Sequence, residues 1–184
     1  MIAAMDKRIA RALGSMRLAF RGVITLVKAA GAIELMQLNG LAGEKLQDNE
    51  YFQHFGLTSN PPVGSMAIVL PIGGKTAHGI IIATEHGTYR LKNLASGEVA
   101  LYDDQGQKIH ISRNGIIVNG AGKQVTITNT PKVRMETANL EVTGDIKDNC
   151  DSTGKTMSGM RTTYNGHTHN DPQGGAVSVP NQDM

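Results

Sequence analysis

The sequence KIHISRNG, IIVNGAGK, QVTITNTP, KVRMETAN, LEVTGDIK, residues 108–147, divides into five consecutive blocks of eight residues. In the first four blocks, the residue at the second position is always aliphatic, and the residue at the fourth position is apolar in three blocks of the four. In the fifth block, the two apolar residues stand one position earlier, at the first and third positions. The apolar positions are Ile109, Ile111, Ile117, Val125, Ile127, Val133, Met135, Leu140 and Val142, with Asn119 as the polar exception. Such alternation followed by a short turn predicts one strand per block. The preceding residues 98–107, EVALYDDQGQ, predict one more strand with Val99 and Leu101 as its apolar positions.

Each of these six predicted strands has one apolar face that must be covered. An antiparallel meander needs a second layer, for which the remaining sequence predicts no helix. A β-helix made by one chain has only about two coils, too few for a stacked solenoid. Three chains wound around one axis point all apolar faces inward, and closed cyclic symmetry is the usual form of such association. We therefore expect residues 96–146 to form an intertwined trimeric β-helix shaft, with a β-sandwich edge of accidental periodicity as the alternative.

The composition excludes several classes of protein. A chain of 184 residues can form one ordinary domain or two small ones. Only 4% of the residues are aromatic, so the core must be built from small aliphatic side chains, which favours thin, repetitive β architecture. A net charge of +2 gives no sign of strong nucleic-acid binding. The single cysteine, Cys150, excludes an intramolecular disulfide, and no apolar run is long enough to predict a membrane span.

Residues 1–20 predict a basic amphipathic helix. Met5, Ile9, Leu13 and Met16 recur at steps of three to four residues, with lysine and arginine residues between them. We expect this helix to dock on a partner subunit. An Arg-rich transit peptide and a helix lying on a membrane surface are the alternatives.

Residues 21–95 predict a small closed β-barrel. Runs rich in Val, Ile and Leu lie at 21–30, 32–40, 64–74, 78–86 and 87–94, separated by Gly, Asn and Pro. About five strands of this length suit an OB-fold, which often binds oligonucleotides. That activity requires aromatic side chains that stack on bases along a basic groove. Because Tyr51, Phe52 and Phe55 gather in one loop-like stretch, we expect a structural barrel, with a nucleic-acid-binding module as the alternative.

The tail, residues 147–184, contains His167 and His169 in the stretch NGHTHN. In an extended segment residues i and i+2 point to the same side, so the two imidazoles project together. Two ligands are too few for a structural zinc site in a monomer. Three chains meeting on an axis supply six nitrogens in an octahedral arrangement, which suits iron, nickel or cobalt better than zinc. The alternative is that both histidines are solvated loop residues.

An enzyme is the competing class of function. A metal-dependent hydrolase using His167, His169 and Asp171 needs a metal ion with an open position. Cleavage of a glycan needs two carboxylates in one cleft. The remaining acidic candidates are Asp103, Asp104, Asp145, Asp148 and Asp151. All of them lie at predicted turns, where Asp is favoured for its hydrogen bonds to the backbone, so we predict no catalytic residue.

Nearly the whole chain resembles a known family. A barrel containing NPPVGSMAIVLPIGGKTAHGIIIAT (60–84), the repeat GEVALYDDQGQKIHISRNGIIVNG (97–120) and the terminal NGHTHN (165–170) follow a short N-terminal helix in that order. This arrangement is similar to the baseplate central spike proteins (baseplate assembly protein V family) of contractile-tailed phages, especially those of Mu-like phages. The resemblance implies a homotrimer with an OB-fold collar, a β-helical shaft and a pointed tip.

The same resemblance implies a function and a cofactor. Spikes of this family are structural proteins that puncture the host outer membrane when the tail sheath contracts. Their partners are the other baseplate and tail tube proteins, and they belong to the virion, assembled in the host cytoplasm. At the tip, one iron ion per trimer is held by a His-x-His sequence of each chain, which corresponds here to His167 and His169. Calcium or chloride ions can also lie on the axis of such tips. No binding to nucleic acid is expected.

Overall fold

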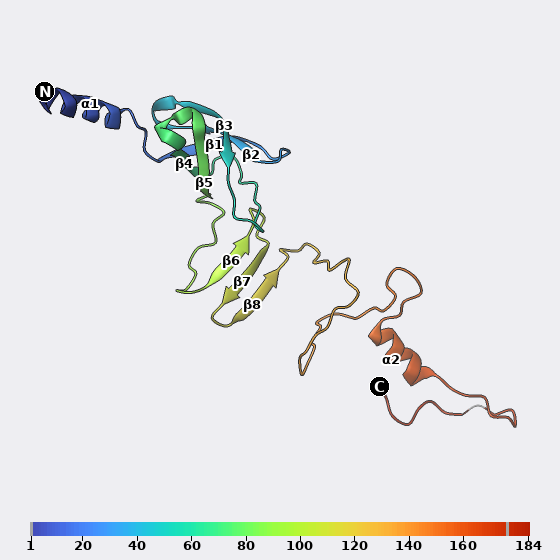
Figure 1. The fold of residues 1–184 in the computed structure, drawn as a ribbon. Coiled ribbons are helices and arrows are strands. Elements are labelled where there is room, and N and C mark those ends of the chain that lie inside the picture. Colours follow the sequence, from blue (N-terminus) through green and yellow to red (C-terminus); the bar gives the residue numbers. More distant parts are fainter. Residues whose placement is uncertain (1, 176) are drawn as a thin grey trace. The chain divides into compact units, whose positions relative to one another are not determined.

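The computed structural model describes residues 2–175 and 177–184 (Figure 1). The chain divides into two compact units: the first ends at Thr126, and the second begins at Ile127. The first unit contains helix α1 (Ile2–Gly14), a five-stranded barrel and a three-stranded sheet. In the described residues of the second unit, helix α2 extends over Met157–Gly166. Helix α1 confirms the expected N-terminal helix, whose predicted first residue, Met1, lies outside the described residues. Of the helices in the described ranges, none has the length and hydropathy that crossing a membrane requires.

The barrel is closed by five strands in the order β1-β2-β3-β5-β4, with β4 paired back to β1. The strands are β1 (Phe20–Lys28), β2 (Glu34–Asn39), β3 (Lys45–Tyr51), β4 (Met66–Pro71) and β5 (Gly79–Glu85). Strands β3 and β5 run parallel, and the other neighbours are antiparallel. Short 3-10 helices lie in the connections, at Leu41–Gly43, Ile72–Gly74 and Thr76–His78. This confirms the expected barrel and has the five-stranded form of an OB-fold.

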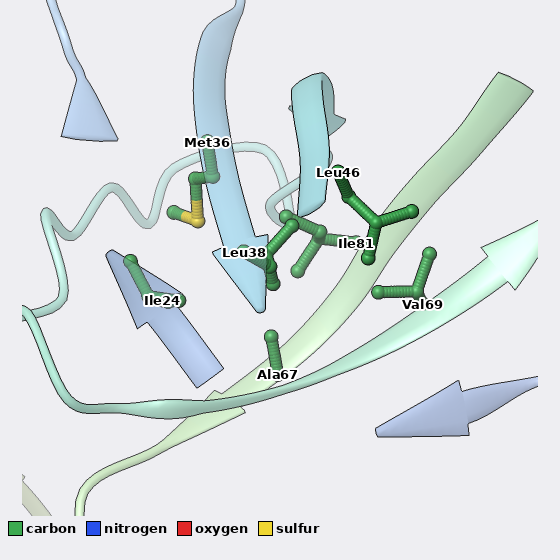
Figure 2. Packing of buried hydrophobic residues seen from close by; sticks show 7 residues of the cluster. All are labelled: Ile24, Met36, Leu38, Leu46, Ala67, Val69 and Ile81. Carbon is green, nitrogen blue, oxygen red and sulfur yellow. The ribbon is translucent and has the colours of Figure 1, made fainter. Parts of the chain in front are cut away.

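The barrel core is small and aliphatic, as the composition predicts. Its buried side chains come from all five strands and are Ile24, Met36, Leu38, Leu46, Ala67, Val69 and Ile81 (Figure 2). Gly79 allows β5 to pack closely against β3 and β4, because it has no side chain. A Cβ atom at Gly79 would lie 2.4 Å from Oδ1 of Asn49 and 2.8 Å from Cγ1 of Val69, so no larger residue fits without moving β3 or β4.

One predicted barrel strand was wrong. Residues 87–94 form turns and irregular backbone, and the fifth strand is instead β3, which the hydrophobic pattern did not indicate. Strand β3 carries mainly charged and amide side chains, and only Leu46 and Asn49 are buried. Its ladders with β2 and β5 hold it in the barrel despite this polar sequence. A strand with one narrow buried face gives little periodic signal.

The three-stranded sheet contains the first three of the six predicted strands. It is an antiparallel meander of β6 (Val99–Tyr102), β7 (Lys108–Ser112) and β8 (Gly115–Asn119). Residues 120–146, all of them described, form no strand in this single chain. Helix α2 was not predicted, because the Gly-rich tail has few apolar residues. Its N-cap is Thr156, whose hydroxyl accepts a hydrogen bond of 3.0 Å from the Gly159 amide.

Candidate functional site

The β6–β8 meander has one face made entirely of aliphatic side chains. In an antiparallel pair, residues directly opposite one another lie on the same face of the sheet. Val99 is opposite Ile111, which in turn is opposite Ile116. Leu101 is likewise opposite Ile109, which is opposite Val118. We call Val99, Leu101, Ile109, Ile111, Ile116 and Val118 the aliphatic face.

The aliphatic face is exposed in the single chain. Between 45% and 71% of the surface of each of its six residues is accessible to solvent. A contiguous apolar surface of this kind marks an interaction site, because isolated exposed aliphatic residues are common but grouped ones are not. The opposite face carries Ala100, His110 and Ile117.

The register of β8 corrects one detail of the sequence pattern. Ile117 and Asn119 were expected to share the face of Ile109 and Ile111. The structure places Ile117 opposite His110 on the other face, because the β7–β8 turn is short and pairs Ser112 with Gly115. Ile116 and Val118 lie on the aliphatic face in their place, so this face has no polar residue in β8.

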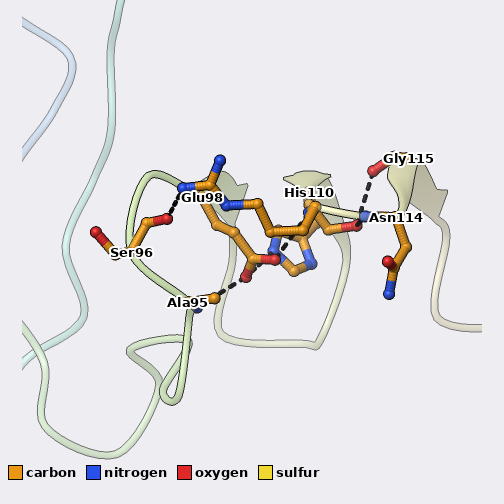
Figure 3. A network of polar contacts seen from close by, with 8 residues as sticks. Ala95, Ser96, Glu98, His110, Asn114 and Gly115 are labelled. Carbon is orange, nitrogen blue, oxygen red and sulfur yellow. Dashed lines mark hydrogen bonds and ion pairs between the residues drawn. The ribbon is translucent and has the colours of Figure 1, made fainter.

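Polar contacts of Glu98 fix the start of the meander (Figure 3). Its carboxylate accepts hydrogen bonds from the amides of Arg113 (2.9 Å) and Ala95 (3.0 Å) and lies 3.2 Å from Nε2 of His110. The guanidinium group of Arg113 donates to the carbonyl oxygen of Ser96. The hydrogen bonds from these backbone amides hold the pKa of Glu98 below its usual range, and the bond from the Arg113 amide has the larger effect. No motif in the sequence indicates this network, because it forms only when the β6–β7 pairing brings His110 and Arg113 next to Glu98.

Three of the acidic residues considered for catalysis, Asp103, Asp145 and Asp148, accept local hydrogen bonds. The Asp103 carboxylate accepts from Gln107 Nε2 (2.7 Å) and the Gln107 amide (2.8 Å), and these bonds lower its pKa. Asp145 accepts from the hydroxyl and amide of Ser158, in the first turn of α2. The Ser158 hydroxyl is the main reason that the pKa of Asp145 falls to about 2. Asp148 accepts from the Lys155 amide at 2.9 Å.

His167 and His169 lie side by side directly after α2. Their ring centroids are 5.0 Å apart in an edge-to-face arrangement, and the ring of Tyr164 lies 5.3 Å from that of His167. His167 has extended backbone angles, as expected for this segment. The two imidazoles are therefore neighbours, which agrees with the prediction that they project together.

The tautomer of His167 follows from its hydrogen bond. Its Nδ1 lies 2.5 Å from the carbonyl oxygen of Tyr164, which can only accept a hydrogen bond. Nδ1 is therefore the donor, and in the neutral imidazole this leaves the lone pair on Nε2. Metal-bound histidines commonly have this arrangement, in which the other ring nitrogen donates to a backbone carbonyl.

The loop after the two histidines is held by a tight turn. The Asp171 amide donates to the Gly175 carbonyl at 2.7 Å, and the Val177 amide donates to the His169 carbonyl at 3.0 Å. Within residues 2–175 and 177–184, no group of three or more His, Cys, Asp or Glu side chains is placed to hold a metal ion. One chain thus offers a pair of imidazoles, with Asp171 engaged in its own turn.

Comparison with known proteins links this fold to phage baseplates. Residues 21–88, nearly the whole barrel, match the family model described as Bacteriophage Mu Gp45, N-terminal. The chain is 28% identical over 177 residues to the Mu-like prophage FluMu protein gp45 of Haemophilus influenzae, an alignment covering 92% of this chain and 87% of that protein. It is 24% identical over 127 residues to the baseplate puncturing device gp45 of Escherichia phage Mu, covering 69% of this chain and 64% of the relative. Residues 21–88 are therefore similar to the N-terminal part of the Mu Gp45 proteins, and the chain as a whole is similar to the gp45 proteins of a Mu-like prophage and of phage Mu.

Proposed function

We propose that this chain is a subunit of the central spike in the baseplate of a contractile phage tail, where it has a structural rather than an enzymatic role. The relative from phage Mu is named as a baseplate puncturing device, and the relative from Haemophilus influenzae is a Mu-like prophage protein of the same designation. The protein is accordingly a component of the virion. Its partners are other baseplate proteins and the tail tube.

The spike is a homotrimer, and the observation that carries this proposal is the exposed aliphatic face. Three copies of the β6–β8 meander, related by a threefold axis, turn their aliphatic faces toward one another and exclude water from all of them. Burying the exposed half of a Val, Leu or Ile side chain contributes roughly 1 kcal/mol. Six such side chains give about 6 kcal/mol per chain from the meander alone.

Residues 124–142 continue the shaft in the trimer. Their apolar side chains, Val125, Ile127, Val133, Met135, Leu140 and Val142, are between 48% and 67% exposed in the single chain. They keep the spacing of short strands, yet one chain offers them no partner strand. Strands from the other two chains supply both the missing ladder hydrogen bonds and the missing apolar cover, which gives the intertwined β-helix.

At the tip, His167 and His169 of three chains hold one metal ion per trimer. The free Nε2 of His167 and the adjacent ring of His169 support this assignment. Six imidazole nitrogens suit iron better than tetrahedral zinc. The bound ion stabilises the fold of the tip, because the free energy of binding to a structural site is free energy of folding. Apolar packing cannot stabilise the tip instead, because the tail has little apolar surface to bury. Calcium or chloride ions on the axis have no assigned ligands.

This arrangement accounts for puncturing. Sheath contraction pushes the spike against the host outer membrane, so the spike must concentrate the force on a narrow tip without unfolding. Intertwined chains resist this load because no subunit can separate alone. The barrel is the collar of the spike and remains with the other baseplate proteins.

The proposal is tested by native mass spectrometry and metal analysis of the full-length protein with both histidines replaced by alanine. The variant is expected to remain a trimer and to lose its metal ion. The matched control replaces Thr168, which lies between the two histidines, with alanine and should keep the ion. A wild-type protein that is monomeric would contradict the proposed function. A trimer without metal would contradict only the tip site.

A further inference from the structure

Two exposed surfaces of the first unit are not used by the shaft or the tip. The first is the apolar side of helix α1. Met5, Ile9 and Leu13 succeed one another at four-residue steps and are therefore on one side of the helix. They are 60%, 53% and 64% exposed. Arg8 borders this side, since it lies three residues after Met5 on the helix surface.

Contacts just after α1 anchor it to the barrel. The Arg17 amide donates to the carbonyl of Gly74 at 3.1 Å, and its guanidinium group forms an ion pair of 2.6 Å with Glu44. The same guanidinium group lies 3.6 Å from the ring centre of Phe20. The base of α1 is therefore fixed, while the apolar side of the helix itself remains uncovered.

The second surface is the loop 52–59 between β3 and β4. Gln53 closes this loop, because its Oε1 accepts from the Ser59 amide at 2.6 Å and its Nε2 donates to the Ser59 carbonyl at 3.1 Å. At the loop tip, the Phe55 side chain is fully exposed and is followed by Gly56, whose φ of +89° permits the turn. A large aromatic side chain that a closed loop preorganises in an exposed position is typical of an interface anchor.

Beside this loop lies a cavity of about 290 Å³, lined by Ile33, Glu34, Phe52 and other residues. Oε2 of Glu34 accepts from Nε2 of Gln53 at 3.1 Å. Oε1 of Glu34 is buried and has no hydrogen-bond donor within the described part of the chain. A buried carboxylate oxygen without a donor is costly and points to a donor supplied from outside the chain. Burial also raises the pKa of Glu34, because it removes water from the carboxylate.

We propose that helix α1 of one subunit docks on the loop 52–59 and the Glu34 cavity of its neighbour. Phe55 packs on the apolar side of α1 around Met5 and Ile9, and Arg8 donates to Glu34. This assignment rests on the trimer of the proposed function. The charges of the two surfaces fit each other, so the partner can be a second copy of this chain. Helix α1 is basic, with Lys7, Arg8 and Arg11 and the single acidic residue Asp6. The cavity presents the carboxylate of Glu34. A contact of this kind joins two different surfaces, and it closes into a ring of three under the threefold symmetry of the proposed trimer.

Disulfide trapping tests the contact in the full-length protein with Cys150 replaced by serine. Met5→Cys combined with Phe55→Cys should give a covalent trimer on oxidation, seen on a denaturing gel without reductant. The matched control is Lys7→Cys with Phe55→Cys, which places the thiol on the opposite side of α1 and should leave single chains. Single chains from the Met5→Cys pair, while native mass still shows a trimer, would overturn the docking and leave the proposed function standing. A native monomer would count against both.

The ion pair is tested separately by exchanging its charges. In the Met5→Cys, Phe55→Cys background, Arg8→Glu or Glu34→Arg alone should lower the yield of covalent trimer by roughly fivefold, as expected for a pair worth about 1 kcal/mol. The two exchanges combined should restore the yield. Equal yields in all four proteins would refute the assignment of Arg8 to Glu34.

Discussion

Replacing Ile109 by asparagine should break the trimer, whereas the same change at Ile117 should not. The two residues are nearly equally exposed in the single chain, at 45% and 48%. They lie on opposite faces of the meander, because Ile109 pairs with Leu101 and Val118 whereas Ile117 pairs with His110. Only Ile109 belongs to the aliphatic face. A comparison of the two asparagine variants therefore distinguishes the loss of burial between subunits from effects on strand propensity and on the stability of the single chain.

The expected magnitude follows from burial. Loss of the apolar contact that Ile109 gains on assembly costs roughly 1 kcal/mol, and an amide buried there without a partner costs roughly 2 kcal/mol more. Three copies give about 9 kcal/mol per trimer, a decrease of roughly a millionfold in the association constant.

The measurement is the mass in solution by light scattering, over a range of protein concentration. Circular dichroism of the same samples shows whether the barrel remains folded. Ile109→Asn should give folded monomers at concentrations where Ile117→Asn remains trimeric. Equal behaviour of the two variants would refute the inward placement of the aliphatic face.

Three further predictions concern the tip and the barrel. Alanine at His167 or His169 should remove the metal ion and make the tail sensitive to protease while the shaft stays trimeric, as measured by elemental analysis and limited proteolysis; retained metal would count against the site. The pKa of Asp145 is lowered to about 2 from its usual 3.8, so its contribution to α2 is complete above pH 3.8 and disappears as the pH falls through about 2. The protection of amides in the first turn of α2, relative to their intrinsic exchange rate, should decrease across that window, and Asp145→Asn should give low protection both above and below it. Gly79→Ala should destabilise the barrel by roughly 2 kcal/mol in denaturant unfolding, since its Cβ would lie 2.4 Å from Asn49 Oδ1; unchanged stability would show that β5 can shift.

The barrel could be predicted from the sequence only where its strands are hydrophobic. Strands β1, β2, β4 and β5 contain runs of Val, Ile, Leu or Met that indicate their positions directly. Strand β3 reads KLQDNEY and is held by its neighbours rather than by its own pattern. Residues 87–94 contain Leu91 and Leu94 but form turns, because a few apolar residues do not by themselves specify a strand.

The repeat predicted the short strands of the meander but not their register. The eight-residue blocks align Ile117 with Ile109, whereas the short β7–β8 turn pairs Ile109 with Val118. A shift of one residue moves every side chain to the other face, so the turn rather than the spacing decides which face is aliphatic.

At the tip, the sequence identified His167 and His169 as a pair but gave no sign of α2. Helix α2 depends on contacts between distant residues, such as the Asp145 carboxylate with Ser158. The hydrogen bond of His167 to the Tyr164 carbonyl exists only because the helix ends there. Such contacts are set by the folded chain and leave no pattern in the sequence.

The most direct test of the spike is the native mass of the purified full-length protein together with its metal content, measured on one sample. We predict three chains and one transition-metal ion other than zinc for each particle. A folded monomer, with or without a metal ion, would contradict the account.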